Sequence, residues 1–212
     1  MSGYAITHRD EIEVIDDGRC PWRPVRHHFG ITSFGVGEWT GENAGDRIIN
    51  EHDEADEHEE LYVVMSGRAA FELNGERKDA PAGTYVFVER GVTRTAFAEE
   101  PGTRVLAIGG APGEAYVPGG YEVWSQLRPM YDAQDYEGVA DRGRELVAQN
   151  PQYPTPIYNV ACCEALVGRK EDAIEHLRQA IALDERFREY ANGDSDFDSI
   201  RDDPAFKALA SG

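Results

Sequence analysis

The sequence predicts an α+β protein built in two parts, a small β-barrel in residues 1–121 and an all-α region in residues 122–212. Between Gly30 and Gly110 the apolar residues come in short runs separated by glycine and charged turns, which is the pattern of strands. After Tyr121 the apolar residues recur at spacings of three and four, which is the pattern of amphipathic helices. Many short strands without intervening helices favour a closed barrel or a sandwich.

The strands of the barrel region follow the apolar runs. Asn74 and Gly75 give a strong hairpin signal after Leu73, because both central positions of a type I′ turn need a positive φ. Residues 1–29 are expected to be an extended lead-in with an edge strand, and the glycine-rich residues 109–120 end the barrel. The expected strands cover residues 31–36, 61–65, 69–73, 85–88, 93–98 and 103–108.

The C-terminal region contains two amphipathic segments that align with each other. Residues 135–140 match 169–174, and residues 146–150 match 180–184. This offset equals the tetratricopeptide period of 34 residues, so the region from about 125 to 187 resembles tetratricopeptide repeats. Residues 194–206 look like the element that closes such an array. The two expected helical faces consist of Val139, Gly143, Leu146 and Val147, and of Ile174, Leu177, Ala180 and Ile181.

The number of repeats limits what this region is expected to do. Such repeats need about three copies to form a stable solenoid or a peptide-binding groove, and this chain has fewer. Packing against the barrel or dimerisation is therefore favoured over a peptide-binding platform. The platform stays open as an alternative and would need an exposed groove centred on Tyr158 and Asn159.

Charge and cysteine content narrow the partners and the compartment. The formal net charge of -19 disfavours nucleic acid and anionic membranes, which are bound through clustered Lys and Arg. Cys20 and the adjacent Cys162 and Cys163 are expected to be reduced thiols, the last two packed in a buried helix. The N-terminus has no apolar signal region, and no segment approaches the roughly 20 apolar residues of a membrane span. A cytoplasmic protein is expected.

Two motif frames lie in the barrel region. Residues 81–83 (Pro-Ala-Gly) are followed after five residues by residues 89–91 (Glu-Arg-Gly), then by Arg94 and Ala98 at the next two motif positions. Residues 60–67 run from a glutamate to a glycine with six residues between them. In spacing, these frames are similar to the two motifs of the cupin family. The resemblance covers about residues 30–110 and implies a double-stranded β-helix, or jelly roll.

The metal-ligand positions of the cupin motifs are only partly retained. Glu60 matches outright, whereas Arg94 stands where the last histidine of the second motif is expected. His52 and His58 lie close to the histidine positions of the first motif, but the spacing there is irregular. On a strand, His58, Glu60 and Tyr62 would point to the same side.

Two interpretations of the site follow. In the first, His52, His58 and Glu60, with Asp56, bind one divalent metal, which would be Fe, Mn, Ni or Zn. In the second, Arg94 replaces the metal and pairs with Glu60 or with the carboxylate or phosphate of a metabolite. Aromatic residues are expected in the core or the pocket wall, and Tyr62 and Phe71 are assigned to the ligand pocket. The expected aromatic set is Phe34, Tyr62, Phe71, Phe87 and Phe97.

Three functions remain open at this point. The barrel binds a small polar or anionic molecule while the helices mediate dimerisation or contact a partner, or it is a metal-dependent oxygenase, isomerase or lyase, or the chain is a scaffold whose helices bind a peptide. The sequence leaves open whether the protein is an enzyme. The cupin resemblance implies a homodimer.

Overall fold

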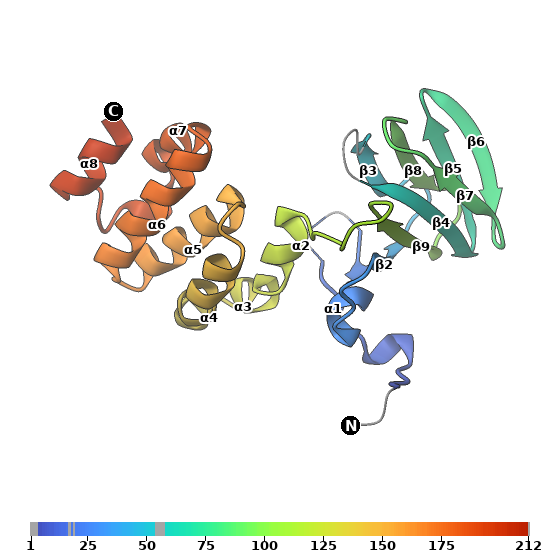
Figure 1. Cartoon of the computed structure of the whole chain (residues 1–212), viewed down its shortest axis with the longest axis horizontal. Helices are drawn as coiled ribbons and strands as arrows, with labels where there is room; N and C mark the ends of the chain where they lie inside the picture. Colours follow the sequence, from blue (N-terminus) through green and yellow to red (C-terminus); the bar gives the residue numbers. More distant parts are fainter. Residues whose placement is uncertain (1–3, 17, 19, 54–57, 212) are drawn as a thin grey trace. The chain divides into compact units, whose positions relative to one another are not determined.

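The computed structural model describes residues 4–16, 18, 20–53 and 58–211. The chain forms two compact units, and the boundary between them lies between Val117 and Pro118. The first contains the strands and the second most of the helices (Figure 1).

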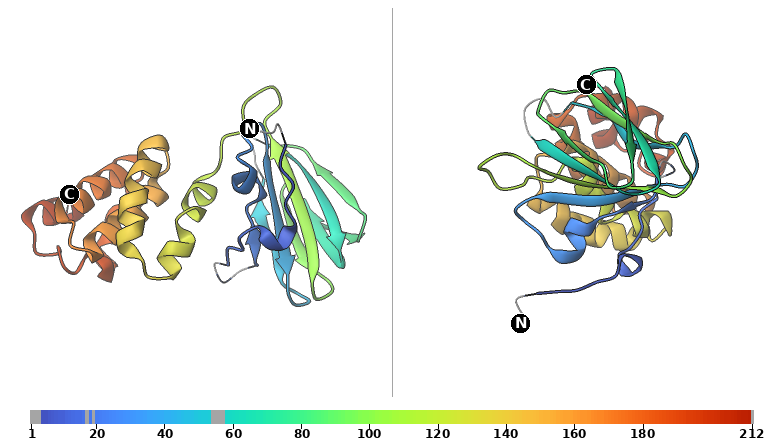
Figure 2. Two further views of the ribbon diagram at one scale, coloured as in Figure 1. Left: turned by 90° about the horizontal axis from the view of Figure 1, so that it is seen from below. Right: turned by 90° about the vertical axis from the view of Figure 1, so that its right-hand side faces the viewer.

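The first unit is an antiparallel jelly roll of two sheets (Figures 1 and 2). One sheet has the order β1-β2-β9-β4-β7 and the other β3-β8-β5-β6. Apart from the two-residue β1 at the edge, the eight strands β2–β9 alternate between the two sheets as in the double Greek key of a jelly roll, so the expected strand architecture is present. The strands are β1 (Trp22–Arg23), β2 (Gly35–Gly41), β3 (Arg47–His52), β4 (Glu59–Ser66), β5 (Arg68–Leu73), β6 (Glu76–Pro81), β7 (Tyr85–Val88), β8 (Arg94–Ala98) and β9 (Thr103–Gly110).

The expected hairpin turn joins β5 to β6. Asn74 and Gly75 both have positive φ, 50° and 79°, and Leu73 pairs with Glu76 across the turn. Both central residues are in the left-handed region that a type I′ turn requires. The prediction of this hairpin from the Asn-Gly pair is confirmed.

The lead-in differs from its expected extended form in two places, first at a 3₁₀ turn, η1 (Arg9–Glu11). β1 is the expected edge strand and pairs with β2, Trp22 opposite Trp39. Directly after it, however, α1 (Val25–Phe29) forms a short helix, ended by Gly30 at a φ of 66°. The three residues after Val25 are polar or charged, and Pro24 precedes the helix, so a sequence of low strand propensity makes one helical turn instead.

The core of the jelly roll lies between the two sheets and follows strand alternation. Tyr62 and Phe71 are buried as expected, with ring centroids 5.4 Å apart. Phe34 and Phe87, expected in the core or the pocket wall, are not in the core, since they are 41% and 56% exposed, but both line a hollow on the surface. The reason for Phe87 is parity, because its neighbour Val88 takes the inward position on β7.

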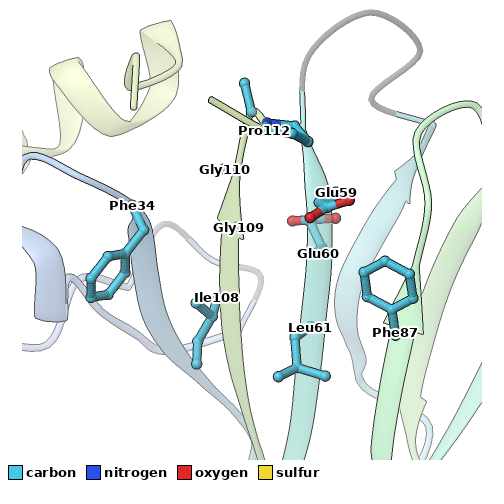
Figure 3. Close-up of a pocket in the computed structure, with 10 residues that line it drawn as sticks. Phe34, Glu59, Glu60, Leu61, Phe87, Ile108, Gly109, Gly110 and Pro112 are labelled. Carbon is cyan, nitrogen blue, oxygen red and sulfur yellow. The ribbon is translucent and has the colours of Figure 1, made fainter. Parts of the chain in front are cut away.

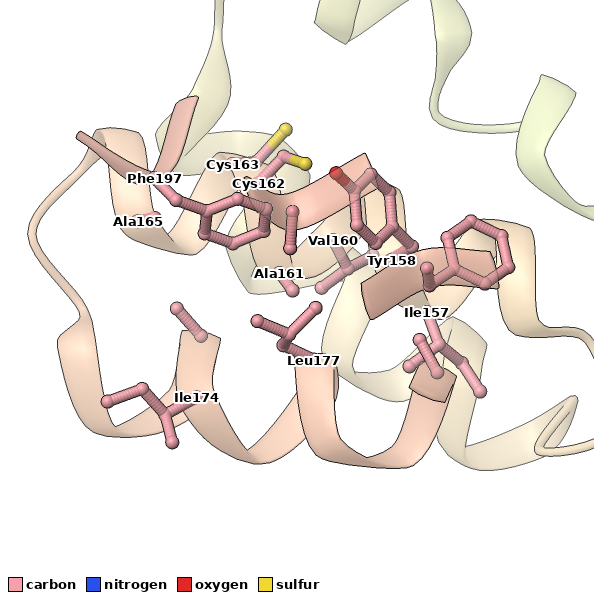
Figure 4. Close-up of a cluster of buried hydrophobic side chains, with 14 of the residues drawn as sticks. Ile157, Tyr158, Val160, Ala161, Cys162, Cys163, Ala165, Ile174, Leu177 and Phe197 are labelled. Carbon is pink, nitrogen blue, oxygen red and sulfur yellow. The ribbon is translucent and has the colours of Figure 1, made fainter. Parts of the chain in front are cut away.

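The second unit is a run of short helices whose buried side chains form one cluster, with Ile157, Leu177 and Phe197 among its members (Figure 4). α4 and α6 are each 14 residues long and share the expected offset of one repeat length. Helical hairpins are thus present, and their tetratricopeptide type stays a prediction. The elements are α2 (Gly120–Ser125), α3 (Arg128–Asp132), α4 (Tyr136–Gln149), α5 (Pro154–Leu166), α6 (Lys170–Leu183), α7 (Arg186–Gly193), a 3₁₀ turn η2 (Ser195–Phe197) and α8 (Pro204–Ser211).

α5 is the central helix of this unit and is buried along most of its length. Gly143 lets α4 approach it closely, since a Cβ at this position would lie 2.5 Å from Val160 Cγ2. Cys162 and Cys163 are buried unpaired thiols, and burial raises the pKa of Cys163 to about 12. They pack as expected and are poor nucleophiles at neutral pH. None of the described helices is both long and apolar enough to span a bilayer.

Candidate functional site

A cluster of charged residues lies at the end of the jelly roll where β3 ends and β4 and β8 begin. Glu60 comes from the first sheet, whereas His52 and Arg94 pair across β3 and β8 of the second. Tyr62 follows Glu60 by two residues and therefore shares its inward face. Side chains from both sheets, four in number and all polar, therefore lie close together between the sheets.

The four side chains meet at one carboxylate oxygen. Glu60 Oε2 accepts hydrogen bonds from Tyr62 Oη at 2.5 Å and from Arg94 Nε at 2.9 Å, and His52 Nε2 lies 3.2 Å from it. Arg94 Nη2 is 2.7 Å from the same oxygen. Of the residues singled out from the sequence, the structure brings together His52, Glu60, Tyr62 and Arg94.

The contacts of the two ring nitrogens of His52 bear on its protonation state. Nδ1 lies 2.7 Å from the carbonyl oxygen of Asn50, and Nε2 faces Glu60 Oε2. Both partners are acceptors, and a neutral imidazole has only one N–H to give. Because Oε2 also accepts from Tyr62 and Arg94, a charged Glu60 and a protonated His52 satisfy all of these contacts, whereas a neutral His52 ring leaves one of its two contacts unmet.

The pKa shifts agree with this assignment. Burial is the largest influence on Glu60 and acts to raise its pKa, but hydrogen bonds from His52, Tyr62 and Arg94 outweigh it and lower the pKa. Burial lowers the pKa of His52, yet the contacts with Glu60 and with the Asn50 carbonyl raise it above its ordinary value. Burial, followed by the charge of Glu60, raises the pKa of Tyr62, which stays a neutral donor.

Arg94 is the most buried charge of the cluster, with no exposed surface, whereas the Glu60 side chain is 16% exposed. Its Nε donates to Glu60 and its Nη1 to the Val92 carbonyl. Among the described residues, Nη2 meets no acceptor at a hydrogen-bonding angle, although it lies close to Glu60. A buried guanidinium thus keeps donor capacity that the protein does not use, which is costly unless water or a ligand takes it.

Gly109 makes room beside the carboxylate. A Cβ at this position would lie 3.2 Å from Glu60 Cγ and 3.7 Å from Oε1. Sequence reasoning missed this role because Gly109 and Gly110 read as a barrel-ending turn, whereas they are the last residues of β9. The Asn50 carbonyl, which fixes the His52 ring, was also missed, and a backbone acceptor leaves no signal in a side-chain pattern.

The remaining predicted site residues lie elsewhere or outside the described part of the chain. His58 stacks on the Tyr116 ring, with centroids 5.1 Å apart. Phe71 is fully buried behind Tyr62. Asp56 lies outside the described residues. Of the described residues in the predicted metal-ligand set, His52 and Glu60 are in contact with each other.

The donor set in this arrangement does not fit a divalent metal. Glu60 Oε2 accepts from Tyr62 and Arg94, and His52 Nε2 faces the same oxygen, so both potential ligand atoms are already engaged with protein groups. A cation on that oxygen would also meet the Arg94 guanidinium, and this repulsion is strong away from bulk water. Among the described residues, one group of three potential ligands has its ligand atoms within 4.8 Å of one another. It lies in the helical unit and consists of Cys162, Asp194 and Asp196.

A shallow hollow of about 300 Å³ opens next to this end of the jelly roll (Figure 3). Glu59 and Glu60 lie on one side of it, and Leu61, Phe87 and Ile108 line its floor. Leu61 and Phe87 face outward, so most of the hollow lies on the outer surface of the five-stranded sheet. Only Glu60 connects it to the cluster.

Comparison with known proteins gives similar structures without a sequence relative. No protein-family model matches the sequence, and no curated protein matches it either. Similar solved structures include a cupin protein from Bacteroides fragilis, at 18% identity and a TM-score of 0.44, covering 55% of this chain and 93% of that one. A predicted oxalate decarboxylase from Thermotoga maritima has 16% identity and a TM-score of 0.41, and the match covers 50% of this chain and 99% of that one. The nucleoside dehydratase Pac13, known from Streptomyces, has 17% identity and a TM-score of 0.39, and the match covers 51% of this chain and 82% of that one.

These matches cover about half of this chain. The jelly-roll description of the first unit rests on the chain's own strand order and register.

Proposed function

We propose that the jelly roll binds a small anionic molecule, a carboxylate or a phosphate, at the cluster of His52, Glu60 and Arg94. The observation that carries this proposal is the buried Arg94 guanidinium, whose Nη2 meets no acceptor at a hydrogen-bonding angle among the described residues. Buried donors in proteins are nearly always satisfied. An anionic oxygen is the strongest partner for a guanidinium N–H.

The charge of the cluster supports an anion as the ligand. The guanidinium of Arg94 has no exposed surface and always carries a positive charge, and its Nη2 is directed to no acceptor at a hydrogen-bonding angle among the described residues. Burying a charged donor without an acceptor costs free energy.

The surroundings favour a small ligand that enters beside Glu60. The His52 side chain is 31% exposed and that of Glu60 16%, so the cluster reaches solvent at this end. Behind it, Tyr62 and Phe71 close the interior with rings that are almost completely buried. Gly109 leaves the space next to Glu60 open.

Titration with simple anions tests the proposal. Acetate, succinate and inorganic phosphate are titrated into the full chain by calorimetry, with thermal unfolding as the second readout. We expect at least one of them to bind and raise the Tm, since a ligand at 100 times its Kd stabilises by about 2.7 kcal/mol. Arg94→Gln should abolish the effect, and His52→Gln should weaken it.

Two variants keep the test interpretable. Arg94→Gln leaves the Glu60 charge buried and can unfold the jelly roll, so His52→Gln provides the second reading. Arg77→Gln is the matched control, because Arg77 is an exposed arginine that also pairs with carboxylates, those of Glu72 and Glu99. Absence of binding by all three anions, or equal binding by wild type and His52→Gln, would contradict the proposal.

The metalloenzyme alternative predicts a different result. Elemental analysis of protein purified without a metal-affinity tag would then show near-stoichiometric Fe, Mn, Ni or Zn, lost in Glu60→Ala. Because His52 and Glu60 do not fit a metal in the arrangement described, we expect the same background metal in both proteins.

For the helical unit we propose a contact role rather than chemistry. Its support is a chain of helices packed around α5, with large apolar side chains left exposed on α5, α6 and α7. These are Leu166, Leu183 and Tyr190. Deleting residues 118–212 would leave anion binding by the jelly roll intact if this division of labour is right.

A further inference from the structure

A thiol and two carboxylates meet where the turn η2 packs against α5 in the helical unit. Cys162 lies on α5, Asp194 directly precedes η2, and Asp196 lies within η2. One ligand atom from each of these residues lies within 4.8 Å of the other two. The anion site proposed for the jelly roll uses none of them. We call Cys162, Asp194 and Asp196 the thiol–carboxylate cluster.

The turn that carries the two aspartates is held in place by contacts outside the cluster. Phe197, at the end of η2, has no exposed surface. Arg201 Nη2 donates to the Asp194 carbonyl oxygen at 2.6 Å. Ser199 Oγ donates to the Ala165 carbonyl oxygen of α5 at 2.9 Å. Packing and hydrogen bonds therefore fix the ligand positions before any ion binds, which lowers the entropy cost of binding.

The carboxylate of Asp194 is oriented by two further hydrogen bonds. Tyr158 Oη donates to Oδ2 at 2.9 Å, and the Asp196 N–H donates to Oδ1 at 3.0 Å. Tyr158 takes one lone pair of Oδ2 and leaves the other for a second partner. Carboxylates that coordinate metals are commonly oriented by such outer hydrogen bonds.

The spacing of the sulfur and the oxygen matches that of two ligands on one zinc ion. Cys162 Sγ lies 3.6 Å from Asp194 Oδ2. Zinc binds thiolate sulfur at about 2.3 Å and carboxylate oxygen at about 2.0 Å in a tetrahedron, which places two such ligands about 3.5 Å apart. A zinc ion that replaced the thiol proton would therefore bind both atoms with little movement.

The two carboxylates of the cluster have no cationic partner within the described part of the chain. Neither Asp194 nor Asp196 forms an ion pair with a Lys or Arg side chain there. Arg201, which follows the turn, donates from Nε to the Asp198 side chain and from Nη2 to the Asp194 backbone carbonyl. Two carboxylates at this separation repel each other. A divalent cation between them would remove that repulsion.

A second thiol stands next to the cluster. Cys163 has no exposed surface, and its sulfur forms no hydrogen bond with any residue that the structure describes. Figure 4 shows its sulfur beside that of Cys162, with both directed away from Leu177 of α6. Sulfur ligands favour zinc, whereas Ca²⁺ and Mg²⁺ prefer sites made of oxygen alone.

We propose that the thiol–carboxylate cluster binds one Zn²⁺ through Cys162 Sγ, one oxygen of Asp194 and one oxygen of Asp196. The fourth ligand is a water, since both aspartates are half-buried and the cluster is open to solvent on their side. On binding, the Cys162 thiol releases its proton to solvent and coordinates as the thiolate. The ion then joins η2 to α5, through residues 32 positions apart in the sequence, and stabilises the helical unit.

Titration with Zn²⁺ alone tests the proposal on the full chain. The protein is purified without a metal-affinity tag, freed of metal with a chelator and titrated by calorimetry, with thermal unfolding as the second readout. We expect one zinc ion per chain and a higher Tm. Asp196→Asn should weaken binding at least about 10-fold. This variant should fold, because the Asp196 side chain forms no hydrogen bond or ion pair with the described residues.

Asp198→Asn is the matched control for the loss of one carboxylate. Asp198 directly follows η2, its side chain is 68% exposed, and its partner is Arg201 rather than the cluster. We expect this variant to bind zinc as tightly as wild type does.

Cobalt identifies the sulfur ligand. Co²⁺ bound in place of Zn²⁺ should give the near-ultraviolet band of charge transfer from a thiolate sulfur to cobalt. Cys162→Ala should lose this band, whereas Cys20→Ala, at a buried cysteine of the jelly roll, should keep it. Tyr158→Phe should weaken zinc binding about 10-fold and keep the band, because Tyr158 orients Asp194 without touching the ion.

Several results would overturn the proposal. Wild type might bind no stoichiometric zinc, or Asp196→Asn and Asp198→Asn might bind it equally well. A cobalt complex without the sulfur band, or with a band that survives in Cys162→Ala, would exclude Cys162 as a ligand. Zinc that is lost in Glu60→Ala would place the ion in the jelly roll, since the thiol–carboxylate cluster does not involve Glu60.

Discussion

Glu60 in the jelly roll and Glu164 in the helical unit are both withdrawn from solvent, and each has a histidine and an arginine beside it. Glu164, on α5, is completely buried, with His176 Nδ1 2.7 Å from Oε2 and Arg144 Nη2 3.8 Å from Oε1. Residue types alone would suggest that the two sites are equivalent. The difference lies in which partner is buried.

In the jelly roll the buried cation is Arg94, and the group that has no hydrogen-bond partner among the described residues is its Nη2. In the helices Arg144 is 53% exposed and also binds Asp172, and the group left over is the acceptor Glu164 Oε1. A buried cationic N–H without a hydrogen-bond acceptor favours the binding of an anion. A buried acceptor without a donor, beside a solvated arginine, does not. The same three residue types thus form a candidate binding site in one unit and an internal packing contact in the other.

The largest difference is expected on removal of the two arginines. Arg94→Met should destabilise the jelly roll by about 3–5 kcal/mol, because it leaves the buried Glu60 without its ion pair. Arg144→Met should cost at most about 1 kcal/mol, as for a solvated ion pair. Urea unfolding of both variants measures the two values, and equal losses would remove the distinction between the sites.

A smaller effect is expected from the phenol of Tyr62. Tyr62→Phe removes one of the donors to the charged Glu60 and should cost about 1.5–3 kcal/mol, the range for hydrogen bonds to charged groups. Tyr85→Phe, at a tyrosine that is 71% exposed, should stay within about 0.5 kcal/mol. If both changes prove neutral, the short contact between Tyr62 and Glu60 does not stabilise the protein.

The smallest effect is a pH dependence that belongs to the jelly-roll cluster. The pKa of His52 is raised above its ordinary value of 6.5, so its contribution is fully present below 6.5 and is lost as pH rises through the folded-state pKa. The pKa of Glu60 is lowered from 4.5, so its contribution is present above 4.5 and lost as pH falls through the folded-state pKa.

The cluster is therefore most stabilising between these two ordinary values. The Tm difference between wild type and His52→Gln should be largest near about pH 5.5 and should shrink as the pH rises past about 7. A difference that stays constant up to about pH 9 would mean that folding does not raise the pKa of His52.

Five of the six expected strands agree with the structure, because glycine turns and strand alternation are local signals. The run at residues 31–36 was wrong, since the strand there is β2 at Gly35–Gly41, and β3 at Arg47–His52 was not expected. Asn74-Gly75 identified its hairpin, and the frame around residues 89–91 placed Arg94 at a site position. The short helix after Pro24 was missed, since one helical turn is too short for a periodic pattern. The outward turn of Phe87 was also missed, because in a strand of four residues a shift of one position reverses which side chains face the core.

Only part of the candidate site could be predicted from the sequence, because the rest depends on contacts between distant segments. The pairing of Arg94 with Glu60 was one of two interpretations from the motif frame, and the structure contains it. That His52 joins them depends on the strand register between β3 and β8, and His58 lies on the Tyr116 ring, which is 58 residues away in the sequence. Neither is encoded in the spacing of residues along one segment.

The strand order also bears on how fast each unit folds. Gly35 at the start of β2 pairs with Gly109 near the end of β9, so the jelly roll closes only when the two ends of its sequence meet. In the helical unit the main contacts join consecutive helices, α4 with α5 and α5 with α6. Chains dominated by distant pairings fold more slowly than those with local contacts. We therefore expect the helices to form first and the contact between Arg94 and Glu60, 34 residues apart, to complete late in folding.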